Sequence, residues 1–116
     1  MSKSLELAKN YLGKEVKVVI DRSLGSKHPK HGFVYEVNYG YIEGVIAPDG
    51  EELDAYLLGV NEPVGEYTGI CMAIAHRKDN DDDKLIVVPK DQFFKDGEIM
   101  ELINFQEKWF DTEIIK

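Results

Sequence analysis

The sequence has one cysteine and no long apolar run, and both shortages limit what this protein can be. Cys71 is the single cysteine among 116 residues, so no disulfide can form within the chain. It lies in the apolar run 70–75, where we expect a buried, unreactive thiol. No segment approaches the roughly 18 apolar residues of a membrane span, and the N-terminus has no apolar signal core. We therefore expect a cytoplasmic protein that does not enter a membrane.

Basic residues are also scarce. The chain has 14 lysines and arginines against 22 aspartates and glutamates, which gives a formal net charge of −8. Proteins that bind nucleic acid or anionic membranes usually present a basic face, so we expect neither partner. A small anionic substrate remains compatible, because a metal ion can neutralise part of its charge. The sequence leaves a homo-oligomer open.

The length and composition predict a single domain over residues 1–116. A hydrophobic content of 43% and a charged content of 31% are ordinary for a globular protein. A chain of this size can bury most of its apolar surface without disulfides. We find no repeat, no low-complexity segment and no interdomain linker.

Periodicity predicts short strands followed by a helix. Breakers at 22–32 indicate a loop, and a period of 3.6 near the C-terminus indicates a helix whose Trp109 and Phe110 we expect in the core. Short strands at roughly ten-residue spacing favour a mainly β fold with α, namely a small OB-like five-stranded barrel with a C-terminal helix. The expected helices are 3–12 and 98–110, and the expected strands are 16–20, 33–37, 41–46, 53–60, 67–77, 84–88 and 112–115.

A tight turn at Pro48-Asp-Gly50 brings several acids close in sequence. On a regular strand Asp49 and Glu51 would face one way and Asp54 the other, so they converge only if the turn bends the chain. A solvated hairpin turn is the alternative. Asp54 argues against it, because an acid inside the apolar strand 53–58 is costly to bury unless it is paired or metal-bound.

A second acidic cluster runs from Asp79 to Asp83 and ends at Lys84. A polar hairpin loop is one interpretation. In the other, Asp82 and Lys84 point to the same face of the following strand, because side chains two apart share a face. That pairing would place a cation ligand beside a phosphate ligand.

Residues 22–32 form a basic island in this acidic chain. Arg22, Lys27 and Lys30 lie here with His28 and His31. A loop that grips phosphate and a flexible solvated loop are both compatible with this composition. The two histidines could also chelate a metal ion.

Three segments together resemble the soluble family I inorganic pyrophosphatases. Residues 35–44, YEVNYGYIEG, resemble the family's Tyr-Pro-x-Asn-Tyr-Gly-Phe/Tyr-Ile-Pro segment. Residues 49–55, DGEELDA, resemble its Asp-x-Asp-Pro-Leu-Asp-Val signature, and residues 82–89, DDKLIVVP, resemble its Asp-x-Lys-Leu-x-x-Val-Pro strand. Their order and spacing agree across about half of the chain, and the family's barrel agrees with the strand pattern.

The resemblance implies roles for individual residues. Mg²⁺, or Mn²⁺ or another divalent cation, would be bound by Asp49, Asp54 and Asp82, with Asp79 as a looser fourth ligand. Glu51 would help to deprotonate the attacking water, so Glu51, Asp54 and Tyr39 are the expected catalytic residues. The groups expected to contact the phosphates of the substrate are Lys84, Tyr39, Tyr35 and either Arg22 or Lys27.

The chain also departs from the family pattern. Glu51 replaces an aspartate, and Trp109-Phe110 stands where the family has a Tyr-Lys pair that grips product phosphate. The resemblance implies metal-dependent hydrolysis of inorganic pyrophosphate to two phosphates. The departures keep two alternatives open: a hydrolase of another small phosphoanhydride such as a nucleotide, and a catalytically silent domain that binds metal or phosphate.

Overall fold

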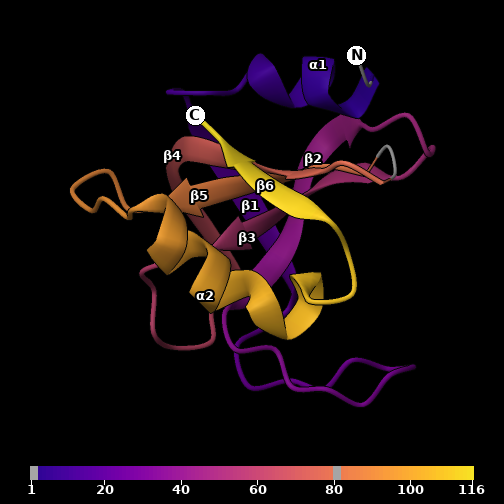
Figure 1. Ribbon diagram of the computed structural model, residues 1–116. Coiled ribbons are helices and arrows are strands. Elements are labelled where there is room, and N and C mark those ends of the chain that lie inside the picture. Colours follow the sequence, from indigo (N-terminus) through magenta and orange to yellow (C-terminus); the bar gives the residue numbers. More distant parts are fainter. Residues whose placement is uncertain (1–2, 80–81) are drawn as a thin grey trace.

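A computed structural model describes residues 3–79 and 82–116 (Figure 1). Two helices and six strands follow one another in the described chain. Their bounds, in chain order, are α1 Lys3–Lys9, β1 Glu15–Arg22, β2 Asn38–Ile46, β3 Glu52–Leu57, β4 Glu66–Arg77, β5 Lys84–Val88, α2 Asp96–Glu107 and β6 Thr112–Ile115.

The first five strands close into a barrel. Neighbouring strands follow the order β1-β2-β3-β5-β4, and β1 also pairs with β4, which closes the ring. β3 and β5 are parallel, and the other pairs in the ring are antiparallel. β6 pairs only with β4 and extends the sheet outside the ring. The predicted five-stranded barrel with a C-terminal helix is confirmed.

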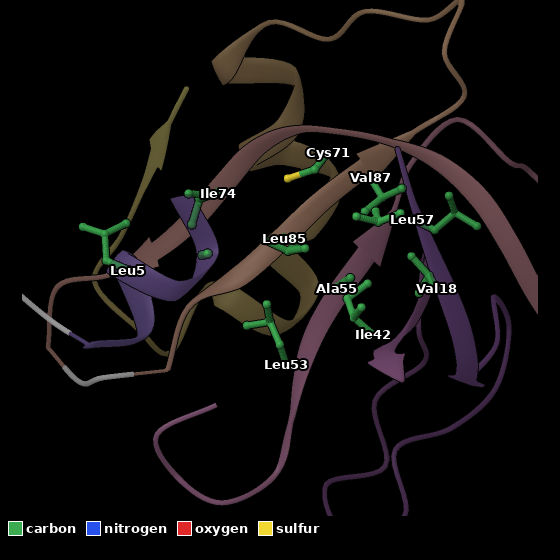
Figure 2. Packing of buried hydrophobic residues seen from close by; sticks show 12 residues of the cluster. Leu5, Val18, Ile42, Leu53, Ala55, Leu57, Cys71, Ile74, Leu85 and Val87 are labelled. Carbon is green, nitrogen blue, oxygen red and sulfur yellow. The ribbon is translucent and has the colours of Figure 1, made fainter. Parts of the chain in front are cut away.

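Two apolar clusters lie on the two sides of the barrel wall. The inner cluster includes Val18, Leu53 and Leu85, and Leu5 of α1 joins it at one end of the barrel (Figure 2). The outer cluster packs α2, through Ile99 and Ile103, against the strands. Because β5 lies between the two clusters, all five of its residues are buried. This explains why its sequence is apolar without alternation.

Close contact between β1 and β2 depends on Gly40. A Cβ atom at this position would lie 1.8 Å from the carbonyl oxygen of Val19 on the neighbouring strand. Only glycine therefore permits this strand pairing, which fixes the position of Tyr39 beside it.

Helix α2 begins after an extended residue, Lys95. The Lys95 backbone N–H donates to the Glu98 carboxylate at 2.9 Å, which satisfies a polar group that the helix itself cannot pair. The chain leaves α2 at residues 108–111 and returns along β4 as β6. This return places the end of α2 beside the end of β4.

Several boundaries differ from prediction. Residues 33–37 were expected to form a strand but lie in the long β1–β2 connection, where the isolated bridge is between Lys27 and Val34. The helix of residues 98–110 begins earlier and ends at Glu107, so Trp109 lies beyond it and is 57% exposed. Placing Trp109 in the core was therefore wrong, and Phe110 is only half-buried. Cys71 is buried as predicted.

Within residues 3–79 and 82–116, neither helix has the length and apolar character needed to cross a membrane.

Candidate active site

A cavity of about 710 Å³ opens where the barrel, the β1–β2 connection and the end of α2 meet. Its charged lining residues are Asp21, Arg22, Asp54, Arg77 and Lys84. The remaining lining is mostly aromatic and consists of His28, His31, Phe33, Tyr35, Tyr39, Trp109 and Phe110, together with Gln106.

Strand register brings the central residues together. Ala55 of β3 pairs with Leu85 of β5, so the residues that precede them, Asp54 and Lys84, lie side by side on parallel strands. Tyr39 of β2 pairs with Tyr56 of β3, which brings its ring over the same region. Residues from three strands therefore meet on one side of the barrel wall.

Lys84 is the centre of this group. Its ammonium nitrogen donates to Asp54 Oδ2 and to Asp82 Oδ1, each at 2.8 Å. Tyr39 donates its hydroxyl to the same Asp54 oxygen at 2.9 Å. Burial, and then the neighbouring charge of Asp54, raise the pKa of Tyr39 well above its usual value, so the phenol remains a proton donor. Asp82 and Lys84 contact each other as the predicted pairing requires, although Asp82 lies just before β5.

A second, more buried ion pair joins β4 to α2. The Arg77 guanidinium donates to both oxygens of Glu107, at 3.0 and 2.7 Å, and to Asp82 Oδ2 at 3.1 Å. One face of the guanidinium lies 3.6 Å from the ring centroid of Phe110. Burial alone would raise the pKa of Glu107, but hydrogen bonds from Arg77 and Tyr56 outweigh it and lower that pKa.

Hydrogen bonds connect this pair to Tyr35 and Gln106 of the cavity lining. Tyr35 donates to Gln106 Oε1 at 2.9 Å, and the Gln106 amide donates to the Tyr56 hydroxyl at 2.7 Å. Tyr56 in turn donates to Glu107 Oε2. These side chains thus form a continuous network behind the cavity lining, and a satisfied network of this kind holds its side chains in fixed positions.

Arg22 and Asp21 lie at the end of β1. Burial is the main reason that the pKa of Asp21 is raised, and the Asp54 carboxylate adds to the effect. Arg22 donates to the Asp21 backbone carbonyl at 3.1 Å. Among the described residues, no carboxylate forms a salt bridge with Arg22, which leaves its guanidinium available to an anionic ligand.

Other residues singled out in the sequence lie elsewhere. Asp49 accepts the backbone N–H of Glu51 at 2.9 Å within the exposed β2–β3 turn, and neither side chain lines the cavity. Asp79 accepts the backbone N–H of Asp111 at 3.2 Å. Lys27 pairs through its backbone with Val34 and is also outside the lining. The structure therefore brings together Asp54, Asp82, Lys84, Tyr39, Tyr35 and Arg22.

Sequence reasoning missed Arg77 and Glu107. The sequence does contain a signal for Glu107. Ile99, Ile103 and Glu107 recur at intervals of four, so they share one helix face. A charged residue on an apolar stripe needs a buried partner of opposite charge. The partner's identity could not be read from the sequence, since Arg77 lies 30 positions away.

The carboxylates that the structure describes do not form an open metal site. Asp54 and Asp82 are suitable ligands for a hard cation, but Lys84 and Arg77 already hold their oxygens. In residues 3–79 and 82–116, no group of three or more His, Cys, Asp or Glu side chains is placed to hold a metal ion. As arranged, the charges of these aspartates are balanced by side chains.

Comparison with known proteins agrees with this fold. The sequence matches the model of the inorganic pyrophosphatase family over residues 5–113. A search of curated protein sequences gave no significant match.

Solved structures of inorganic pyrophosphatases share the fold. The Ehrlichia chaffeensis enzyme has a TM-score of 0.69 at 21% identity, with 90% of this chain and 86% of that chain covered. The Neisseria gonorrhoeae enzyme has a TM-score of 0.64 at 21% identity, with coverage of 80% and 72%. The Helicobacter pylori enzyme has a TM-score of 0.64 at 16% identity, with coverage of 86% and 81%. Because the family match spans nearly the whole sequence, the chain belongs to the inorganic pyrophosphatase family.

Proposed function

We propose that this chain hydrolyses inorganic pyrophosphate to two phosphates, and that the cavity is the active site. Family membership supports the reaction. The observation that carries the assignment of the site is the convergence of Asp54, Lys84 and Tyr39 from three strands at one wall of the cavity. These groups combine a carboxylate for water with donors for phosphate oxygens.

Lys84 and Arg22 are the proposed phosphate ligands. Lys84 supplies a compact positive charge and Arg22 a planar one, and both suit phosphate oxygens. An entering phosphate would compete with Asp54 and Asp82 for the Lys84 ammonium. Tyr39 and Tyr35 would then form the wall beside the bound phosphates.

Asp54 is the carboxylate best placed to orient water and accept its proton. Its side chain is 35% exposed and lines the cavity, so water reaches it. The water oxygen would form a new bond to one phosphorus, the bridging P–O bond would break, and the second phosphate would leave. The role of Glu51 as the base stays a prediction from the resemblance, as do the ligand roles of Asp49 and Asp79 and the phosphate contact of Lys27.

A requirement for Mg²⁺ or Mn²⁺ also stays a prediction from the resemblance. The described contacts support charge balance by Lys84 and Arg77, so we assign no step to a bound metal. A cytoplasmic location and a lack of nucleic-acid or membrane partners are proposed from composition. A homo-oligomer remains compatible with all of these observations.

The test is release of phosphate from pyrophosphate by purified protein, with Mg²⁺, Mn²⁺, Zn²⁺ or Co²⁺ and with a chelator. We expect turnover, and we expect Asp54→Asn to lower kcat by about 100-fold because it removes the proton acceptor. Asp91→Asn, which changes an exposed acid outside the cavity, is the matched control and should retain the rate.

No phosphate release under any of these conditions would refute the proposal. So would an Asp54→Asn variant that turns over as fast as Asp91→Asn. Phosphate binding measured by calorimetry without turnover would instead favour the alternative of a silent binding domain.

A further inference from the structure

The cavity has more room and more aromatic surface than two phosphates need. Its volume of about 710 Å³ falls within the range of about 300–1,000 Å³ found for sites of drug-sized ligands. Rings line most of the part that Lys84 and Asp54 do not. Tyr35 and Tyr39 belong to the wall proposed for the phosphates, but the exposed Trp109 has no role in a site for pyrophosphate alone.

The rings form a row that leads from the cavity mouth to Lys84. Trp109 and Phe33 have ring centroids 5.4 Å apart, Phe33 and Tyr35 are also 5.4 Å apart, and Tyr35 and Tyr39 are 5.6 Å apart. Tyr39 then contacts Asp54, which holds Lys84. A ligand that follows this row would meet rings first and the ammonium last.

The outer end of the row is exposed. Trp109 is the single tryptophan and leaves 57% of its surface in solvent, although large aromatic side chains are usually buried. His28 packs on Phe33 with ring centroids 4.9 Å apart and widens this aromatic surface. The Lys108 ammonium lies 4.8 Å from the Trp109 ring centroid, although Lys108 does not itself line the cavity. Exposed rings beside cationic groups are suited to stack on a planar heterocycle that carries phosphates.

We propose that the substrate or ligand of this cavity is a phosphoanhydride attached to a planar aromatic group, as in a nucleoside diphosphate. The base would stack at Trp109 and Phe33, and the phosphates would reach Arg22 and Lys84. This inference rests on the proposed function, because it uses the same phosphate ligands, Arg22 and Lys84. The chain's net charge of −8 does not by itself oppose it, because the cavity lining has three cations, Arg22, Arg77 and Lys84, against two carboxylates, Asp21 and Asp54.

The experiment compares ADP with pyrophosphate, which carries the same diphosphate without a ring. Binding is measured by calorimetry under one metal condition, and quenching of Trp109 fluorescence reports stacking directly because no other tryptophan contributes. We expect ADP to bind about tenfold more tightly than pyrophosphate, in line with the contribution of one stacked base. ADP should also quench Trp109, whereas pyrophosphate should not.

Two variants test the role of the ring. In Trp109→Leu the ratio of the dissociation constants for pyrophosphate and ADP should fall close to one. In Trp109→Phe, which keeps an aromatic face, most of the preference for ADP should remain. Equal affinities in the unaltered protein, or the same preference in Trp109→Leu, would overturn the inference.

The assay for pyrophosphate turnover separates the two proposals. Turnover of pyrophosphate without any preference for ADP refutes the proposed binding of a planar ring at Trp109 and Phe33, and it leaves the proposed function intact. A preference for ADP that depends on Trp109, without turnover of pyrophosphate, supports the proposed ring binding and refutes the proposed function.

Discussion

Lys84 is the residue on which the cationic end of the cavity depends. Its side chain is 3% exposed, and its ammonium is shared between Asp54 and Asp82. A buried lysine is stable in this position because both of its neighbours are carboxylates that accept hydrogen bonds from it. The same contacts mean that a metal ion and Lys84 compete for the same two aspartates.

Replacing Lys84 should therefore expose a metal site. In Lys84→Met the two aspartates lose the ammonium between them, and we expect the affinity for Mn²⁺ to rise by about tenfold, since a hydrogen bond to a charged group contributes roughly 1.5–3 kcal/mol. The measurement is titration of Mn²⁺ by calorimetry in the absence of phosphate.

Lys90→Met, which removes an exposed lysine just beyond β5, is the control and should bind Mn²⁺ like the unaltered protein. Equal affinity in both variants would contradict competition between Lys84 and the metal.

At the scale of elements, the Arg77–Glu107 pair attaches α2 to the end of β4. Both side chains are almost fully buried, with exposures of 6% and 0%. Tyr56 and Thr112 also donate to Glu107, so elements from four parts of the chain meet at one carboxylate. Removing Glu107 would leave the buried Arg77 with Asp82 as its remaining acidic partner, and removing Arg77 would leave the Glu107 carboxylate buried without a cation.

Glu107→Gln is expected to lower the free energy of unfolding at neutral pH by about 3–5 kcal/mol. The folded-state pKa of Glu107 is lowered, so its contribution is complete above the unfolded value, about 4.3, and is lost as the pH falls through the lower folded value. Urea unfolding of both proteins at neutral and acidic pH should show the difference shrinking in acid. Glu101→Gln, an exposed acid on the same helix, is the control. A difference that stays constant with pH would contradict this account.

At the scale of the whole molecule, the closed barrel protects its interior. Cys71 is fully buried in the inner cluster, and burial raises the pKa of its thiol to about 11. A thiolate forms readily only in solvent, so the thiol should react only when the barrel opens.

Labelling of Cys71 by a thiol reagent should therefore report unfolding of the barrel. Leu85→Ala leaves a cavity at the centre of the inner cluster and is expected to cost about 2–5 kcal/mol. When the barrel recloses faster than the reagent reacts, the labelling rate follows the equilibrium between the closed and open barrel. The rate in Leu85→Ala should therefore exceed that of the unaltered protein by the factor that corresponds to its lower free energy of unfolding, measured in urea. Fast labelling of the unaltered protein would instead indicate local access to Cys71.

The sequence by itself determined the barrel and named the central residues of the candidate site. Alternating apolar residues, the apolar run of β5 and the turn residues indicated the strands, because local periodicity records which face each residue buries. Asp54 could be singled out because it is an acid inside an apolar strand, whereas Asp82, Lys84 and Tyr39 were named through the acidic cluster before β5 and the resemblance to the family segments. Only the tertiary structure decided that Arg77 and Glu107 pair, that Trp109 lies exposed at the cavity mouth, and that Asp49 and Glu51 lie outside its lining. Those outcomes depend on which distant segments meet, and a local pattern carries no record of that.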